Sequence, residues 1–347
     1  MGDGVMRAVV ITGPGGPEVL RLREVPAPEP GPGEVLVRVR AVGLNRADVL
    51  QRKGHYPAPA GAPADIPGLE YAGEVATPPA GGADRARPWK PGDRVMGLVG
   101  GGACAEYLVA PADTVLPVPE LPDPPAAASG PAAASLVRAA AVPEAFLTAF
   151  DALVLQLGMR AGETLLIHAV SSGVGTAAVQ LARAWGARSI GTSRSAEKLR
   201  RALPLGLDVA VDTSREDFVE AARRETGGRG VDLVLDLVGG PVLEGNLKAL
   251  APRGRMIIVG LTAGRSAPLD MGLVLNKRLT IVGTVLRSRD LAEKVALASA
   301  FERDVLPRFP TGTLRPVLDR VFPMAEVAEA HRVMEANAHF GKLVLAW

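Results

Sequence analysis

The sequence contains very little cysteine: Cys104 is the only one in 347 residues. A single thiol cannot form an internal disulfide, and it cannot build a metal site from several cysteines. A disulfide-stapled scaffold and a four-cysteine structural zinc site are therefore excluded. One unpaired thiol also suits a reducing compartment, and we expect the protein in the cytoplasm.

Long hydrophobic runs and an excess of one charge are also missing. No run of about 20 apolar residues free of charge occurs, so we expect no membrane-spanning helix. Residues 1–6 lack the basic segment and apolar stretch of a signal peptide. The 39 basic and 37 acidic side chains are scattered and leave a formal net charge of +2. Without a concentrated basic block, nucleic acid is not an expected partner.

The first third of the chain predicts a strand-rich domain with irregular loops. Residues 34–42 alternate apolar and polar side chains, the pattern of a half-buried strand. Turns rich in glycine and proline, at 31–33 and 91–93, separate the elements. Further strands are expected at 7–12, 71–76, 94–98 and 105–109.

Residues 122–141 differ from the rest in composition. They are rich in alanine, proline and serine and low in complexity. We interpret them as a surface insertion, with the alternative that their second half begins a helix.

From residue 161 onward, strand and helix patterns alternate. The strand candidates are continuous apolar runs, which indicate a parallel sheet covered on both faces. Repeated β-α units of this length predict a doubly wound α/β fold of the Rossmann type. The strands are expected at 164–169, 189–192, 209–211, 231–237, 256–260 and 279–284, and the helices at 176–185, 196–203, 216–226 and 242–250. The tail from 324 predicts a helix and a last strand at 342–346, returning to the first domain.

The sharpest local motif lies where the strand at 164–169 meets the next helix. Ser172, Gly173, Val174 and Gly175 lead into Ala178, which is a G-x-G-x-x-A dinucleotide fingerprint. The motif follows a strand, opens a helix and heads a βαβ array, which is the context that supports it. The helix amides would then face the phosphates of a dinucleotide.

The end of the second Rossmann strand indicates which dinucleotide. NAD-specific sites usually place an acid there, about 20 residues after the glycines. This chain instead has hydroxyl and basic side chains, which favour a 2′-phosphate and therefore NADPH. These residues are Thr192, Ser193, Arg194, Ser195 and Lys198. Arg194 and Lys198 as plain surface charges are the alternative.

Three N-terminal stretches, 42–57, 67–75 and 91–95, resemble the GroES-like domain of medium-chain dehydrogenases. Zinc enzymes of that superfamily carry Cys where this chain has Asn45, and His where it has Leu69. Leucine cannot bind zinc, and a catalytic zinc needs three protein ligands, so we expect no metal. The resemblance implies a strand-rich GroES-like catalytic domain at 1–142, with 300–347 returning to it, and a Rossmann NADPH-binding domain at 143–299.

Within the superfamily the chain looks most like the zinc-free quinone oxidoreductases, of the stress-inducible NADPH-dependent type related to zeta-crystallin. The resemblance rests on residues 44–48, 54–57, 141–150, 167–182, 235–240, 284–290, 315–323 and 329–345, and departs at 122–139. It implies hydride transfer from NADPH to a quinone and a homodimer. Reduction of enals, enones or enoyl thioesters stays open, as does a non-catalytic role in nucleotide or RNA binding.

The resemblance also implies roles for single residues. Asn45, Asp48 and Tyr56 would line the nicotinamide cleft as catalytic residues. Asn45 would hold a carbonyl, and Tyr56 would stack on the acceptor or hydrogen-bond its oxygen. For Asp48 a helix-capping role is an equal alternative. Glu70 is expected to pair structurally.

Further cofactor contacts follow from the same resemblance. Thr213 stands where the family has a tyrosine near the 2′-phosphate. Asn337 and Lys342 would reach the cofactor phosphates, with a surface position as the alternative for Lys342. The other implied contacts are Thr148, Gly239, Gly260, Leu261, Leu286, Arg287 and Ser288. His168, within a predicted strand, is expected to be a hydrogen-bonded core histidine.

Overall fold

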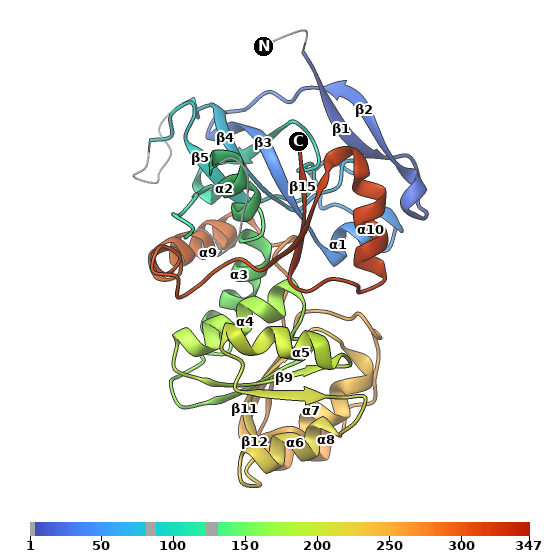
Figure 1. Ribbon diagram of the computed structural model, residues 1–347, viewed down its shortest axis with the longest axis vertical. Helices are drawn as coiled ribbons and strands as arrows, with labels where there is room; N and C mark the ends of the chain where they lie inside the picture. The colour runs from blue at the N-terminus through green and yellow to red at the C-terminus, as the bar shows by residue number, and fades with distance from the viewer. Residues whose placement is uncertain (1–3, 81–87, 123–130) are drawn as a thin grey trace. The chain divides into compact units, whose positions relative to one another are not determined.

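A computed structural model describes residues 4–80, 88–122 and 131–347, and the chain divides into two compact units (Figure 1). Unit 1 comprises Met1–Leu147 and Leu286–Trp347, and unit 2 comprises Thr148–Val285. The boundaries expected from the sequence differ from these: the first, after residue 142, lies just before α3 (Pro143–Phe150), which the units divide, and the second, after residue 299, lies inside α9 (Leu291–Asp304) of unit 1. An alternation of strands and helices cannot reveal which unit a helix packs on.

Unit 1 is built on a seven-stranded sheet in the order β14-β15-β3-β4-β5-β7, with β6 also pairing β3. The strands are β3 (Glu34–Leu44), β4 (Glu70–Thr77), β5 (Arg94–Leu98), β6 (Tyr107–Pro111), β7 (Leu116–Pro117), β14 (Leu318–Pro323) and β15 (Lys342–Ala346). The expected return of the tail is confirmed, because β15 pairs antiparallel with β3. Most of β3 is buried rather than half-buried, since it is a central strand with β4, β6 and β15 against it.

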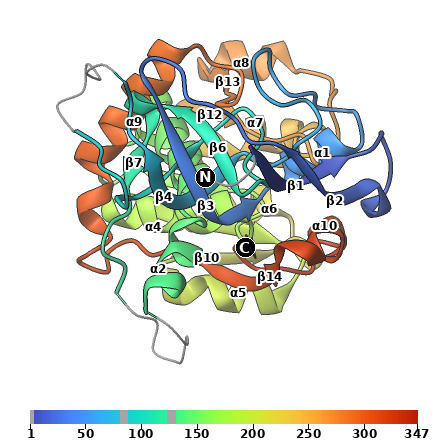
Figure 2. The same ribbon diagram turned by 90° about the horizontal axis from the view of Figure 1, so that it is seen from above.

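A separate pair of strands, β1 (Val5–Ile11) and β2 (Leu20–Pro26), forms an antiparallel ribbon in unit 1. Figures 1 and 2 both show the two strands side by side. The inward side chains of β1 join a small core with Ile66 and Ala105.

Unit 1 also contains helices α1 (Arg46–Arg52), α2 (Pro131–Ala139) and α10 (Val327–Glu335), besides α9 and the first five residues of α3. Helix α2 confirms that the second half of the low-complexity stretch is helical; residues 123–130 lie outside the described residues. By length and composition alone, the helical stretch Ser135–Gln156 could cross a membrane, with a mean hydropathy of 1.3. Because 78% of it is buried within the protein, it reads as a core helix.

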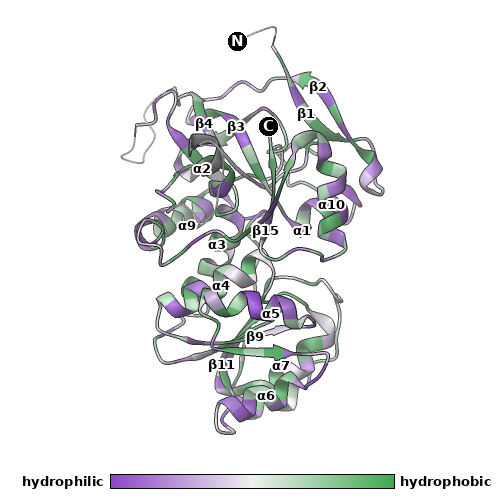
Figure 3. Cartoon of the chain, in the orientation of Figure 1, coloured by the Kyte–Doolittle hydropathy of each residue, from purple (hydrophilic) through white to green (hydrophobic). Residues whose placement is uncertain are grey.

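Unit 2 is a six-stranded parallel sheet in the order β10-β9-β8-β11-β12-β13, so the predicted doubly wound fold is confirmed. The strands are β8 (Thr164–Ile167), β9 (Arg188–Ser193), β10 (Val209–Asp212), β11 (Val231–Asp236), β12 (Leu250–Ile258) and β13 (Thr280–Gly283). The helices are α4 (Gly173–Ala184), α5 (Ala196–Ala202), α6 (Phe218–Glu225), α7 (Leu243–Ala249) and α8 (Met271–Lys277). Figure 3 shows hydrophobic residues along β11 and hydrophilic ones on α5.

Helix α8 is the element of unit 2 that the sequence pattern does not predict. Its seven residues are too short for a clear helical period. Its start is nevertheless marked, because the Asp270 side chain accepts a hydrogen bond from Leu273 N at 3.0 Å.

A buried polar network crosses the core of unit 2. His168 lies 2.9 Å from the Thr192 hydroxyl through Nδ1 and 2.6 Å from Asn246 Oδ1 through Nε2. Asn246 in turn donates to Asp236 Oδ2 at 3.1 Å. The expectation of a hydrogen-bonded core histidine is confirmed, and burial lowers the pKa of His168, which keeps it neutral.

Candidate active site

Unit 2 gathers most of the predicted cofactor residues at one edge of its sheet. Ser172 follows β8, Arg194 follows β9 and Thr213 follows β10; Gly239 and Gly260 follow β11 and β12. All five therefore lie beyond the carboxyl ends of parallel strands, where open α/β sheets bind their ligands. The order of the strands reverses between β8 and β11, which puts Ser172 and Gly239 beside the switch point.

The predicted phosphate loop opens α4. The Ser172 side chain caps this helix by accepting a hydrogen bond from Gly175 N at 3.0 Å. A Cβ on Gly175 would lie 2.6 Å from the carbonyl oxygen of Ala169, so glycine is needed for the loop's own packing. The left-handed residue of the turn is Ala169, with φ 48°, rather than Gly173. Gly173 and Val174 stand in the first turn, where backbone N–H groups have no partner within a helix and favour an anion.

The residues beyond β9 fit a phosphate group on the ribose. Arg194 is exposed, and the described residues offer its guanidinium no partner. Ser195 caps α5 by accepting a hydrogen bond from Lys198 N at 3.3 Å, which places that lysine in the first turn. Thr213 joins the ends of β9 and β10, because its N–H donates to Ser193 O at 3.0 Å. No acid follows Ser193 directly, and the preference for a 2′-phosphate stays a prediction.

Thr192 does not join this group through its side chain. Its hydroxyl is buried against His168, and the residue is 3% exposed. Successive side chains of a strand point to opposite faces, so Thr192 turns into the core while Ser193 turns outward. The predicted contact of the Thr192 side chain with the 2′-phosphate is therefore corrected.

Two glycines at the same edge have no room for a side chain. A Cβ on Gly239 (φ 80°) would lie 2.6 Å from Gly264 O, and one on Gly260 would lie 2.9 Å from Leu237 O. Asp236 draws the first of these loops in, since its Oδ1 accepts from Gly239 N at 2.9 Å. Leu261 remains 47% exposed and available to a ligand.

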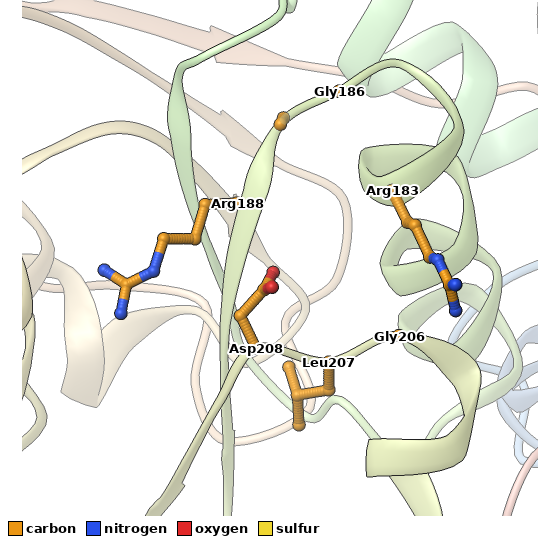
Figure 4. A pocket seen from close by; sticks show the side chains of 7 residues that line it. Arg183, Gly186, Arg188, Gly206, Leu207 and Asp208 are labelled. Atoms are coloured by element: carbon orange, nitrogen blue, oxygen red, sulfur yellow. The ribbon is translucent and has the colours of Figure 1, made fainter.

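A hollow of about 560 Å³ in unit 2 lies at the opposite ends of the strands (Figure 4). Its lining residues Ala187 and Asp208 precede β9 and β10, so it sits at amino rather than carboxyl ends. Arg188 is engaged by Glu225 at 2.7 Å, and Asp208 accepts from Ser189 N at 2.7 Å. This hollow is not the dinucleotide site that the strand order predicts.

In unit 1, three predicted or suspected site residues meet in a buried cluster. The Lys342 ammonium donates to Glu70 Oε1 at 2.5 Å, Asn45 Oδ1 at 2.6 Å and Leu44 O at 2.8 Å. Asn45 Nδ2 donates to Glu70 Oε1 at 2.8 Å and Gly43 O at 3.2 Å. Lys342 is 4% exposed and Glu70 is fully buried. The structural pairing expected of Glu70 is confirmed, and its partner is Lys342.

This cluster corrects two expectations. Lys342 neither reaches cofactor phosphates nor lies on the surface, because its three N–H groups already serve three buried oxygens. Asn45 has no amide proton left for a substrate carbonyl, since both are used within the cluster. Asn337, the other residue expected at the phosphates, accepts from Arg46 at 2.6 Å within unit 1.

Asp48 has the geometry of helix capping, the alternative to a catalytic role for this residue. Its Oδ2 accepts from Asn45 N at 2.8 Å, and its Oδ1 accepts from Gly68 N at 3.0 Å. Burial raises the pKa of Asp48 to about 6, against the lowering effect of these bonds and of Lys342. Both carboxylate oxygens are occupied by backbone groups, which favours the structural role.

Tyr56 lies in the loop after α1 and is contacted by Arg287. The guanidinium donates to Tyr56 O at 3.1 Å and lies 5.0 Å from the centroid of its ring. Leu286 and Arg287 are buried in unit 1, and Ser288 is exposed. Thr148, the first residue of unit 2, is 5% exposed within α3.

Sequence reasoning missed three residues of these sites: Gln51, which binds Arg287, and Asn246 and Gly264 of unit 2. An amide on a short helix one turn after Asp48 is a weak signal. Only the burial of its partner makes Gln51 notable.

A metal centre has little support in the part of the chain described. Residues 4–80, 88–122 and 131–347 contain no group of three or more His, Cys, Asp or Glu that could hold a metal ion. The position between Asn45 and Glu70 is taken by the Lys342 ammonium.

Comparison with protein families assigns both units. The profile described as an alcohol dehydrogenase GroES-like domain matches residues 31–120, and the one described as a zinc-binding dehydrogenase matches residues 173–300. With the GroES-like sheet and the Rossmann sheet, these define a medium-chain dehydrogenase/reductase. A quinone oxidoreductase of Pseudomonas aeruginosa is 36% identical over 95% of this chain and 96% of its own. One of Homo sapiens is 30% identical over 99% and 98%. The chain belongs to the quinone oxidoreductase family.

Solved structures show the same architecture. An NAD-dependent alcohol dehydrogenase is 35% identical, with a TM-score of 0.82 over 99% of this chain and 100% of that one. A mycobacterial protein complexed with NADPH is 29% identical, with a TM-score of 0.81 over 99% and 100%. The CurK enoyl reductase is 28% identical, with a TM-score of 0.80 over 99% of both chains.

Replacing Lys342 by methionine should destabilise the protein strongly. The change leaves the buried Glu70 carboxylate without its counter-charge, which costs about 3–5 kcal/mol. Chemical denaturation with NADPH affinity measured in parallel would check this. Lys342→Met combined with Glu70→Leu should lose less than the sum of the single changes. Lys248→Met, at an exposed ion pair, is the control and should change nothing measurable. Unchanged stability with weakened NADPH binding would contradict this assignment.

Proposed function

We propose that the protein reduces quinones with NADPH and without zinc. The observation that carries this proposal is the Lys342 ammonium between Glu70 and Asn45, held by three oxygens at 2.5–2.8 Å. By the resemblance, Asn45 and Leu69 stand at two positions that bind zinc in the zinc enzymes of this superfamily, and the Lys342 ammonium donates to Asn45, which supports a site without metal. The nicotinamide, when bound, supplies the hydride, and the protein supplies binding and position.

Several features of unit 2 support NADPH as the cofactor. The first turn of α4 suits a pyrophosphate, and the exposed Arg194 suits a 2′-phosphate. A solved relative is complexed with NADPH. NADH is the competitor, because another similar structure is described as an NAD-dependent alcohol dehydrogenase.

An apolar cavity in unit 1 supports a hydrophobic acceptor. It holds about 40 Å³, room for a few water-sized groups, and Leu69 forms part of its wall. Its other apolar lining residues are Leu98, Val99, Leu147, Leu286, Leu297 and Ala298. Thr114, Glu144, Arg287, Arg289 and Lys294 also line the cavity, and its volume is smaller than a quinone ring, so it supports an apolar group of the acceptor rather than the whole ring.

A second candidate is the reduction of activated carbon–carbon double bonds. Two similar solved structures are described as enoyl reductases, CurK at 28% identity and JamJ at 25%. This reaction needs the same hydride geometry and a proton for the reduced acceptor, so the site residues would keep their roles.

We also propose that two copies associate through the open edge of unit 2. Strand β13 ends the sheet, and helix α8 just before it exposes Met271 at 75% and Leu275 at 74%. Exposed edge strands and apolar patches are typical association sites.

The activity assay follows NADPH consumption with 1,2-naphthoquinone and, in parallel, with a simple enone and with NADH. We expect rapid quinone reduction with NADPH that persists in EDTA. Turnover of the enone alone would favour the second candidate. Loss of activity in EDTA, restored by zinc, would overturn the zinc-free proposal.

Arg194→Gln should raise the KM for NADPH by roughly 10- to 150-fold, because one charge-assisted contact to a phosphate is worth about 1.5–3 kcal/mol. The KM for NADH should stay the same. Arg200→Gln, at an exposed arginine of α5, is the matched control. Equal effects on both cofactors would contradict a 2′-phosphate contact at Arg194.

The oligomeric state is measured by light scattering on a sizing column. The protein should elute as a dimer, and Met271→Glu with Leu275→Glu should shift it to a monomer, because charge on the patch opposes its burial. Leu203→Glu, at an exposed leucine elsewhere on unit 2, should leave the dimer intact. A monomeric wild-type protein at micromolar concentration would refute this proposal.

A further inference from the structure

Among the described residues, the hydrogen bonds of the buried Arg287 all go to uncharged oxygens, while the carboxyl groups of Asp48 and Glu144 act on its charge without a hydrogen bond. Its guanidinium donates to Gly100 O at 2.7 Å, Tyr56 O at 3.1 Å and Gln51 Oε1 at 2.5 Å. The residue is only 8% exposed. Burying a charge among uncharged oxygens is costly. An apolar side chain would fill this space at a lower cost than an arginine. The charge and the several N–H donors of Arg287 therefore indicate a specific role in holding the groups that it binds.

The three acceptors of Arg287 come from three different segments of unit 1. Gln51 lies in α1, Tyr56 in the loop that follows it, and Gly100 beyond β5. The planar guanidinium is suited to such a junction, because its donors have fixed directions. Arg287 therefore holds two loops against α1.

The loop of Tyr56 depends on this outside support. Pro57 and Pro59 follow the tyrosine and have no N–H to donate. The preceding turn uses Gly54 in the left-handed region, with φ 76°. Arg287 fixes Tyr56 at two points, by the hydrogen bond to its carbonyl and by the cation–π contact at 5.0 Å.

The phenol of Tyr56 is left available by these contacts. Within residues 4–80, 88–122 and 131–347, its hydroxyl makes no hydrogen bond. Burial raises the pKa of Tyr56, Arg287 opposes this rise, and Glu144 adds to it. The hydroxyl thus keeps its proton at neutral pH and is free to donate it.

We infer that Arg287 is a positioning residue, which holds Tyr56 so that its hydroxyl donates a proton to the acceptor. This rests on the proposed reductase function. A quinone gains a hydride from NADPH and a proton from Tyr56. The phenolic O–H bond breaks, an O–H bond forms on the hydroquinone, and the phenolate recovers a proton from solvent. The cofactor leaves as NADP⁺, so charge and electrons balance.

The test is a double-mutant cycle on the full-length protein. Tyr56→Phe and Arg287→Met should each lower kcat for 1,2-naphthoquinone about 10- to 100-fold. This loss is at or below the lower end of what general acid catalysis typically contributes. The double variant should be no slower than the slower single variant, because both changes remove the same proton donor. The Kd for NADPH should not change. Multiplying losses, or an unaffected Tyr56→Phe, would overturn the inference.

Two further variants guard the interpretation. Gln51→Met removes one acceptor of Arg287 and also the hydrogen bond from Gln51 Nε2 to Ala64 O at 3.1 Å. Its smaller loss of kcat should vanish when Tyr56 is already phenylalanine, and this arm stands if Arg287→Met fails to fold. Arg303→Met, at an exposed arginine of α9, is the matched control and should keep full activity. A loss in Gln51→Met that persists without the phenol would contradict a role through Tyr56.

A spectroscopic readout separates this inference from the proposed function. Three tyrosines are present, so the difference in tyrosinate absorbance at 295 nm between the wild type and Tyr56→Phe isolates Tyr56. Arg287→Met should move that titration to higher pH, because the nearby cation is gone. If Arg287→Met leaves the titration of Tyr56 unchanged, the contact between the two residues is refuted, even if the protein reduces neither quinone nor enone. If the wild type is active but the losses of kcat in the double-mutant cycle are additive, the positioning role is refuted and the proposed function stands.

Discussion

The ion pair of Lys342 and Glu70 is the constraint on which the catalytic unit depends. It joins β15, the last strand along the chain, to β4, and Lys342 also binds Asn45, the residue before α1. A buried pair of charges is stable only when its remaining hydrogen bonds are satisfied. Asn45, Leu44 and the backbone N–H of Glu144 complete these bonds, so the centre of unit 1 is rigid and polar within an otherwise apolar wall.

The residues of this part of unit 1 differ in how their polar groups are used. Asn45 and Asp48 spend their polar groups on the protein itself, and so they shape the site rather than meet an acceptor. In the part of the chain that the structure describes, Arg287 holds Tyr56 by its carbonyl and its ring, and no hydrogen bond engages the Tyr56 hydroxyl. The polar groups of Asn45 and Asp48 are therefore used within the protein, whereas Arg287 holds Tyr56 without using its hydroxyl.

The sequence predicts regular elements well and long-range partners poorly. The Rossmann strands are recognisable because they are continuous apolar runs, and Gly175 is recognisable because its position follows a strand. The partners of Lys342 and Arg287 come from segments far away along the chain, and no local pattern encodes such an ion pair or such a fork of hydrogen bonds. The predicted contact of Thr192 with the 2′-phosphate is wrong for a simpler reason. Successive side chains of a strand alternate between its two faces, so a shift of one position decides whether a side chain is exposed or in the core.

The return of the last strand has a consequence for how the chain is made. Unit 2 is continuous in sequence, whereas unit 1 is closed only when β15 inserts between β14 and β3. Domains generally fold as units during synthesis, N-terminal parts first. The sheet of unit 2 can therefore form on the ribosome before the sheet of unit 1 is complete, and a chain that ended before β15 would leave the buried Glu70 carboxylate without its counter-charge.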